Sequence, residues 1–203
     1  MVKILCVSDI VMPQMESAAN LRRRYNDVDV IVSCGDLPPV YLEFIVSILN
    51  VPLLYVRGNH DEIYTRQPPG GDDLNGRIMK FKGLTFAGLE GSMRYSKGSI
   101  QYTEGEMLRK VIGMGPGIMV RRLFGQKIDV LVTHSPPRGI HDAEDLPHRG
   151  FKAMLNFLHV YQPRYMLHGH VHTYDRRKKT RTQFRNTCII NINPVTVLEI
   201  EPD

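Results

Sequence analysis

A short apolar run at residues 51–56, Val-Pro-Leu-Leu-Tyr-Val, is followed almost at once by the tetrapeptide Gly58-Asn59-His60-Asp61. The run predicts a buried strand, and the tetrapeptide predicts the loop at its carboxyl end. Gly58 lets the backbone turn sharply, and Asn59 offers an amide oxygen that can ligate a cation. His60 offers an imidazole able to move a proton near neutral pH, and Asp61 a carboxylate that could orient it. These four residues alone fit an ordinary polar turn as well as a functional loop. The rest of the sequence is needed to distinguish the two interpretations.

Upstream of this loop, strand-like and helix-like segments alternate. Residues 2–8 and 28–33 predict two further strands, and residues 16–25 and 40–49 predict the helices that connect the three strands. This alternation is typical of a parallel sheet with right-handed crossovers, which brings the carboxyl ends of its strands to one edge.

The second half of the chain predicts more strands than helices. A hairpin is expected at 77–82 and 84–89, buried strands at 128–133 and 164–167, and a final antiparallel set at 174–185, 187–192 and 195–200.

Two helices are expected in the same half, at 104–124 and at 149–161. The first must be broken, because Gly113, Gly115, Pro116 and Gly117 lie inside it. Its methionines, Met107, Met114 and Met119, are interpreted as core filler.

Polar residues follow five of the predicted strands at the point where each strand ends. They are Asp9, Asp36, Asn59, His134 and the histidines of the stretch 168–172. A single Asp after a strand is usually a turn residue or a helix cap. Five such positions, each at a strand's carboxyl end, instead predict one ligand crevice.

The residue types in this set point to a divalent metal. Asp, Asn and His without Cys suit Mn, Fe, Zn, Ni or Co. The set is larger than one four-coordinate ion requires, and it would serve two ions about 3.5–4 Å apart that share a carboxylate and a water. Such a pair activates the water and neutralises charge during displacement at phosphorus.

The same residues carry a family resemblance. The pieces Ser8-Asp9, Gly35-Asp36, Gly58 to Asp61, Thr133-His134 and Gly169-His170-Val171-His172 resemble the motifs of the calcineurin-like metallophosphoesterase superfamily, in the same order. The resemblance spans residues 8 to 172. It implies a four-layer αββα sandwich of two mixed β-sheets flanked by helices, with the last strands in a second sheet.

The resemblance also implies a role for each residue. Asp36 would bridge two metals; Asn59, His134 and His170 would complete one site, and Asp9 and His172 would hold the other. His60 would stabilise the transition state or protonate the leaving group, with Asp61 as its partner. Asn59 would also lie at the substrate, and His168 is not required by the family pattern.

One position departs from the family. The first motif of the family is Asp-x-His, whereas this chain has Asp9-Ile10-Val11, so one metal site lacks an imidazole. The weakened site would fill only at high metal concentration, or His141, Asp142 or Glu16 would reach into it. The other alternative is a protein that binds one metal and acts as a scaffold for a protein partner, as some members of this superfamily do.

The loop after His134 is rich in charged residues. His148 and Arg149 lie near the predicted start of a helix, a geometry that favours phosphate, and we expect them to contact the substrate. A loop closed by internal salt bridges explains the same residues equally well.

Composition limits the classes of partner. The chain has 203 residues, enough for one domain over 1–203, and no apolar run approaches a membrane span. The three cysteines lie in strand-like runs without C-x-x-C spacing, which predicts free thiols and a cytoplasmic protein without a signal peptide. The net charge of +5, with a basic run at 176–181, permits a nucleic-acid partner. A solvated hairpin explains that run better, because no aromatic residues are interleaved with it.

The sequence therefore predicts a hydrolase: a phosphatase or phosphodiesterase that uses one or two divalent metal ions, such as manganese in a dinuclear centre. A small phosphate ester, including a nucleotide-type one, is the expected substrate. Oligomeric state is left open.

Overall fold

The computed structural model describes residues 1–172 and 179–202. The basic run at 176–181 and the strand predicted at 174–185 therefore lie partly outside the described residues. None of the helices within the described ranges is long and apolar enough to cross a membrane.

The first sheet has parallel strands at its centre and one antiparallel edge. Its five strands follow the order β13 (Val195–Ile200), β1 (Val2–Val7), β2 (Val30–Ser33), β3 (Leu53–Tyr55) and β4 (Asp72–Asp73). Strands β1 to β4 are parallel to their neighbours, as the alternation of strands and helices predicts, and β13 runs antiparallel to β1.

The second sheet is also mixed. Its six strands follow the order β11 (Arg181–Phe184), β12 (Thr187–Asn191), β10 (Tyr165–His168), β9 (Val130–Thr133), β6 (Leu84–Leu89) and β5 (Ile78–Phe81). The four central strands are parallel, and the two edge strands are antiparallel to their neighbours. Two short strands, β7 (Ser92–Met93) and β8 (Gln101–Tyr102), pair beyond the ends of both sheets.

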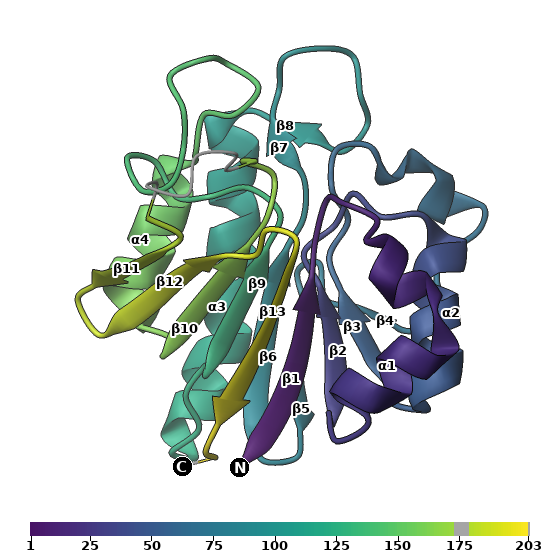
Figure 1. Ribbon diagram of the computed structural model, residues 1–203. Helices are drawn as coiled ribbons and strands as arrows, with labels where there is room; N and C mark the ends of the chain where they lie inside the picture. Colours follow the sequence, from purple (N-terminus) through teal and green to yellow (C-terminus); the bar gives the residue numbers. More distant parts are fainter. Residues whose placement is uncertain (173–178, 203) are drawn as a thin grey trace.

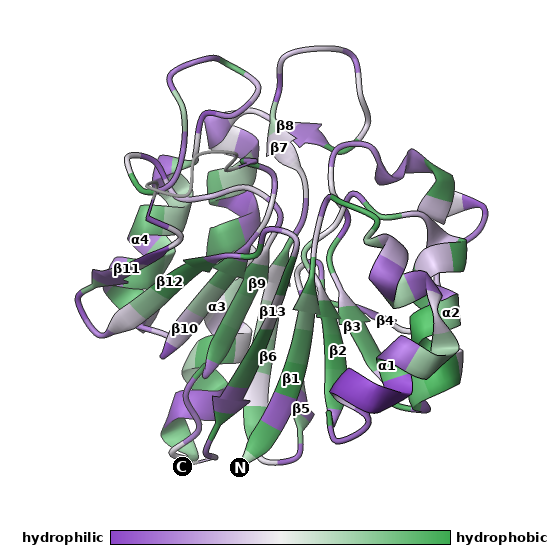
Figure 2. Cartoon of the chain, in the orientation of Figure 1, coloured by the Kyte–Doolittle hydropathy of each residue, from purple (hydrophilic) through white to green (hydrophobic). Residues whose placement is uncertain are grey.

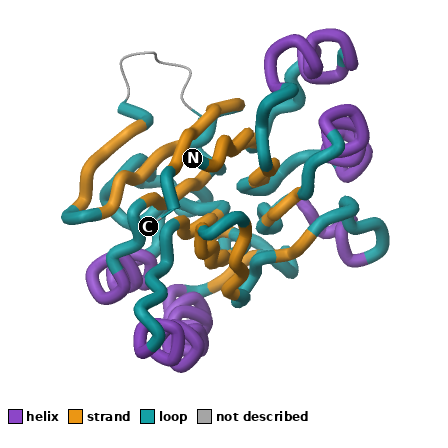
Figure 3. Tube along the Cα trace, turned by 90° about the horizontal axis from the view of Figure 1, so that it is seen from below, coloured by secondary structure: helices purple, strands orange, loops and turns teal. Residues whose placement is uncertain are grey.

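Helices cover the outer face of each sheet (Figure 1). The 3₁₀ helix η1 (Pro13–Glu16), α1 (Ala18–Tyr25) and α2 (Pro39–Leu49) lie against the first sheet, with the 3₁₀ helix η2 (Asp61–Thr65) nearby. The second sheet is covered by α3 (Glu104–Leu123) and α4 (Lys152–Tyr161). Seen along the strands in Figure 3, the two sheets lie between the two groups of helices. The four-layer αββα sandwich expected from the sequence is confirmed.

Three apolar clusters fill the three spaces between these layers. Side chains alternate along β1, so Ile4 and Cys6 join the cluster between the sheets, whereas Leu5 and Val7 join the cluster under α1 and α2. The third cluster packs Met154 and Phe157 of α4 against the second sheet. Figure 2 shows the same pattern as hydrophobic strands below and more hydrophilic loops above.

The structure corrects three sequence predictions. The last three strands do not form one antiparallel set, because β12 is parallel to β10 and β13 joins the first sheet through β1. The helix α3 is continuous through Pro116, which lies on its exposed side, where water can bind the carbonyl that proline leaves unpaired. The helix α4 begins at Lys152 rather than Arg149.

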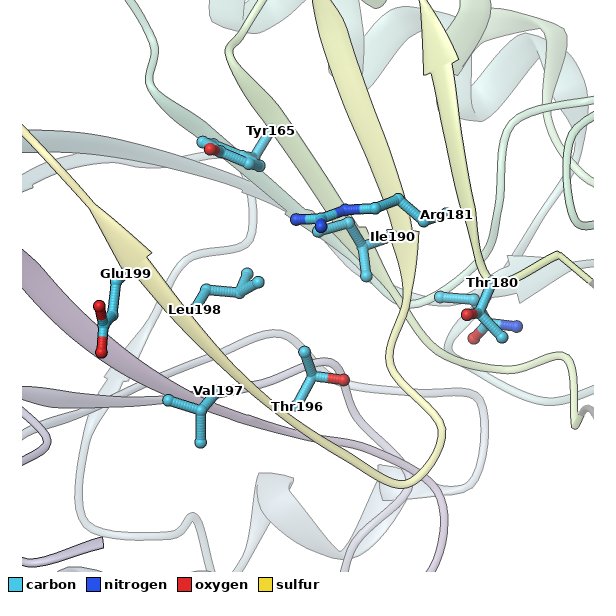
Figure 4. Close-up of a pocket in the computed structure, with 9 residues that line it drawn as sticks. Tyr165, Thr180, Arg181, Ile190, Thr196, Val197, Leu198 and Glu199 are labelled. Atoms are coloured by element: carbon cyan, nitrogen blue, oxygen red, sulfur yellow. The ribbon is translucent and has the colours of Figure 1, made fainter.

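The two sheets separate along one side, where β13 faces β10, β11 and β12. A groove of about 460 Å³ lies in this opening, and Arg181 and Leu198 project into it from opposite sheets (Figure 4). None of the site residues predicted from the sequence lines this groove.

Candidate metal centre

A small pocket lies where the loops after the parallel strands meet. Asp9 follows β1, Asp36 follows β2, Asn59 follows β3, His134 follows β9, and His170 follows β10. The pocket has a volume of about 260 Å³ and is lined by Asp9, Asp36, Asn59, His60, Tyr95, Pro147, His148, His170 and His172. The structure thus brings residues from both sheets to one place, as the strand-end argument requires.

The backbone of these loops is held in uncommon conformations. Asp9, Asp36 and His170 have φ angles of 63°, 57° and 69°, a region that residues other than glycine rarely adopt. The loops also touch closely: a Cβ atom on Gly58 would lie 2.0 Å from Oδ1 of Asp36, and one on Gly169 would lie 2.3 Å from Oδ2 of Asp9. Strained loops packed without a side chain between them are typical of sites that fix functional groups.

A possible ligand set for a cation lies at this pocket: Asp36 and His170 line it, and the buried His134 adjoins them. One ligand atom from each of Asp36, His134 and His170 lies within 4.8 Å of the others. The Nε2 atom of His134 is 3.1 Å from the amide oxygen of Asn59. A carboxylate, an amide oxygen and two imidazoles, with no thiolate, suit a borderline or hard divalent ion.

Hydrogen bonds fix both imidazoles in orientations suited to metal binding. The Nδ1–H of His134 donates to the carbonyl of Cys34 at 2.8 Å, so its Nε2 faces Asp36. The Nε2–H of His170 donates to the carbonyl of Pro147 at 2.7 Å, which leaves Nδ1 as the nitrogen with a lone pair. Carbonyl partners of this kind orient histidine ligands and raise their basicity.

The charges in this set are strongly coupled. Burial alone lowers the pKa of His134, but the Asp36 carboxylate outweighs burial and raises that pKa to about 9. Burial and the nearby His134 lower the pKa of His170 to about 3. Burial opposes ionisation of Asp36, yet His134 and the backbone amide of His60 hold its pKa well below the usual range. A divalent ion would compete with the proton on His134 for the same negative charge.

Asp9 and His172, the predicted ligands of the second ion, line the same pocket. Both carboxylate oxygens of Asp9 accept the backbone N–H of His170, at 2.9 and 3.1 Å. Val11 lies elsewhere: it packs in the apolar layer under α2 and borders a hollow with Tyr41 and Phe44. Position 11 therefore contributes an apolar side chain to the helix layer.

None of the three residues expected as substitutes for the missing imidazole lines the pocket. His141 contacts His168 at 3.0 Å and Thr182 at 2.8 Å. Asp142 forms an ion pair with Arg138 at 2.7 Å. Glu16 borders the hollow beside Val11.

His60 and Asp61, the predicted catalytic pair, point to different places. His60 is exposed at the mouth of the pocket, and its backbone N–H donates to Oδ1 of Asp36 at 2.8 Å. Asp61 is buried, and its Oδ2 accepts the backbone N–H groups of Asp36 and Gly58, both at 2.7 Å. Among the hydrogen bonds of the described residues, 1–172 and 179–202, none joins Asp61 to the ring of His60. One donor lies on the turn of Asp61 and the other in the loop after β2, so Asp61 ties these two loops together rather than orienting His60.

Of the two residues predicted to bind phosphate, His148 and Arg149, only the first lines the pocket. His148 lies at the pocket, with its ring centre 5.2 Å from that of His170, and its Nδ1 pairs with Asp145 at 2.5 Å. Arg149 does not line the pocket, and it donates to the carbonyl of Glu144 at 3.0 Å. Because α4 begins after Arg149, the internally closed loop describes this residue better than a phosphate site at a helix start.

Sequence reasoning missed Tyr95. This residue lies in the loop between β7 and β8, lines the pocket, and accepts a hydrogen bond from Nδ2 of Asn59 at 3.2 Å. No motif marks it, because residues 91–101 have no clear periodicity. The side-chain oxygen of Gln101 accepts the backbone N–H groups of Tyr95 and Ser96, and these contacts help to hold the tyrosine over the site.

Solved structures that match with TM-scores above 0.5 agree with this fold. The protein TT1561 of Thermus thermophilus matches with a TM-score of 0.63 and 12% identity, over 95% of this chain and 89% of that chain. GAP50 of Plasmodium, described as the anchor in the inner membrane complex, matches with a TM-score of 0.53 and 13% identity, over 95% and 71%. Vps29 of Chaetomium thermophilum matches with a TM-score of 0.46 and 13% identity, over 99% and 83%.

No curated protein matches the sequence. The family profile described as calcineurin-like phosphoesterase matches residues 2–174, which is most of the chain and includes every predicted ligand. The chain therefore belongs to the calcineurin-like phosphoesterase family.

Proposed function

We propose that the protein is a metal-dependent hydrolase of a small phosphomonoester or phosphodiester. The observation that carries this proposal is the convergence of Asp36, His134 and His170 within 4.8 Å, at a pocket lined by Asp36, His170 and His60. Membership of the calcineurin-like phosphoesterase family supports the same reaction class.

In this proposal, Asp36, Asn59, His134 and His170 hold one divalent ion, and Asp9 and His172 share Asp36 to hold a second, weaker one. A bound ion would lower the pKa of its water and neutralise charge on the phosphoryl oxygens. Manganese is among the metals that such a ligand set accepts.

The other pocket residues act on the substrate. His60, exposed at the mouth, delivers a proton to the leaving oxygen, because an imidazole can change protonation state near neutral pH. His148 and Tyr95 border the same small pocket and orient the phosphate group. A volume of about 260 Å³ favours a small ester.

A metal-bound scaffold without activity is the second candidate. The position of Val11 favours it, because the second ion would have only Asp9, His172 and the shared Asp36 as ligands. We further propose that residues 1–203 form one domain and that the protein is cytoplasmic, which is consistent with the free cysteines Cys6, Cys34 and Cys188.

Hydrolysis of p-nitrophenyl phosphate and of its bis ester separates the two candidates. The enzyme proposal expects turnover with added Mn²⁺, loss of turnover after chelation, and recovery when Mn²⁺ is restored. Elemental analysis of the purified protein identifies the bound metal and its stoichiometry. Bound metal without turnover of either ester would favour the scaffold.

A further inference from the structure

The solvent-facing side of α3 is apolar over more than three turns. We define its outer face as the exposed residues Ile112, Pro116, Met119, Val120, Leu123 and the C-cap Phe124. Leu123 and Phe124 are 83% and 77% exposed. Contiguous apolar surface of this kind is typical of a binding surface in a soluble protein.

Met119 illustrates how unusual this face is. The sequence interpretation assigns Met107, Met114 and Met119 to the core, and only the first two are buried. The side of α3 that faces the second sheet already has its own apolar residues, so Met119 and its neighbours are not needed for the core of the protein.

The shape of this surface suits a second helix. Ile112, Pro116, Met119 and Leu123 follow a 4-3-4 spacing, the repeat that forms a seam between packed helices. Beside the seam, a groove of about 660 Å³ separates α3 from the edge strand β5 and includes Ile78 and Val120.

Glycines leave space in this groove. Gly113 and Gly117 both border it, and a Cβ atom on Gly113 would meet no atom within 4 Å. The groove is therefore open to an inserted side chain.

The segment that carries the face has charges of one sign. Residues 107–128 contain five cations and no Asp or Glu. At about 100° per residue, Arg121 and Arg122 lie on opposite flanks of the outer face. Arg121 donates to the carbonyl of Ile78, and Arg122 donates to the carbonyls of Val160 and Tyr161. No carboxylate in the described part of the chain pairs with either arginine.

We propose that the outer face of α3 docks an amphipathic helix of another protein, one whose apolar side chains enter the groove and whose Asp and Glu residues meet Arg121 and Arg122. A second copy of this chain packed through the same face would bring the same cations and no carboxylate from residues 107–128, so like charges would oppose it. A bilayer would not use the groove, which accepts protruding side chains. This surface is separate from the metal pocket and does not depend on the proposed reaction.

The test uses a display library of amphipathic helical peptides of about 20 residues, the length of α3, with both flanks randomised. Selection against the full chain should enrich Asp and Glu at the flanks. The best peptide, resynthesised, should bind at least about tenfold more weakly to Leu123→Glu and Phe124→Glu. Gly113→Leu places a side chain in the groove without meeting other atoms of the protein at its Cβ, and it should weaken peptide binding to a similar extent.

Matched controls separate a specific surface from general stickiness. Val40→Glu changes an apolar residue that is 74% exposed on α2 and should leave binding unchanged. Arg122→Glu should weaken binding of the acidic peptide. Replacing the acidic residues on one flank of the peptide with Lys should restore binding to this variant. Thermal melts establish that each variant is folded.

Other outcomes would overturn the proposal. These are a library that yields no binder, selected peptides without acidic flanks, and binding that the α3 variants do not change. Light scattering that shows a dimer dissolved by Phe124→Glu would assign the face to self-association. Binding to phosphatidylserine vesicles that Phe124→Glu abolishes would assign it to a membrane.

Discussion

The Nε2 atom of His134 lies 3.3 Å from Oδ2 of Asp36, although the two residues follow strands of different sheets. The pair joins the two halves of the sandwich at the floor of the pocket. Both groups are held from behind, because the carbonyl of Cys34 accepts a hydrogen bond from His134 and the backbone N–H of His60 donates one to Asp36.

We expect Asp36→Asn to lose most metal affinity, because the amide removes the negative charge that attracts the ion. A decrease of about 100-fold or more is expected, since loss of an outer partner of a ligand alone costs about 10–100-fold. Calorimetric titration with Mn²⁺ measures it. The control is Asp27→Asn, which removes an exposed carboxylate paired with Lys3. Equal affinity in Asp36→Asn and wild type would contradict a site centred on Asp36.

His60→Ala should slow hydrolysis by about 10²–10⁴ while metal content stays unchanged, because the side chain acts on the leaving group and is not a ligand. The initial rate with phenyl phosphate, whose poor leaving group needs a proton, measures the loss. p-Nitrophenyl phosphate, which has a better leaving group, should show a smaller loss, and a purely structural role would not produce this difference. His159→Ala, an exposed histidine on α4, is the control. Full activity in His60→Ala would remove His60 from the mechanism.

Val11→His should strengthen the second ion site, because it restores the Asp-x-His motif beside Asp9. Elemental analysis at low metal concentration should then give about two ions per chain. Val40→His on α2 serves as a control for an added surface imidazole. Unchanged stoichiometry would mean that the packing of position 11 against Tyr41 and Phe44 keeps its side chain out of the pocket.

Glu90→Gln should destabilise the protein by about 3 kcal/mol, because it leaves two cations without their shared carboxylate. Glu90 is buried and accepts from Arg57 at 2.7 Å and Lys110 at 3.2 Å. Urea unfolding measures the difference, and Glu199→Gln, on the surface, should change stability little.

The effect of Glu90 should also depend on pH. Burial alone raises the pKa of this carboxyl, but Arg57, Tyr102 and Lys110 outweigh burial and lower it below its ordinary value of 4.5. A lowered folded pKa means that the stabilisation is present above about pH 4.5 and is lost as the pH falls through the folded value. The difference in the free energy of unfolding between wild type and Glu90→Gln should therefore become smaller in acid. A gap that stays constant down to about pH 3 would contradict the ion-pair explanation.

Pro116→Ala should stabilise the protein, because alanine restores the backbone donor inside α3. Proline costs about 3 kcal/mol relative to alanine in a helix interior, so removing it should stabilise the folded state. Alanine also gives the unfolded chain more conformational freedom, which offsets part of this stabilisation. We expect about 1–2 kcal/mol by urea unfolding. Pro39→Ala should give no such gain, because Pro39 is the first residue of α2, where proline is tolerated. A destabilised Pro116→Ala would show that the ring packs favourably where it is.

Residue order alone predicts the alternation of strands and helices and the polar residues at the strand ends. Apolar periodicity and motif spacing are local properties, so Asp9, Asp36, Asn59, His134 and His170 could be placed after their strands from the sequence.

Which of these groups meet and which turn away depends on the three-dimensional packing of the chain. Asp61 binds backbone amides, Arg149 closes its own loop, Tyr95 enters the pocket, and the outer side of α3 stays in solvent. The physical reason is that each outcome depends on competition among partners far apart in the chain. The spacing of residues along a sequence does not record which donor, carbonyl or apolar surface wins that competition.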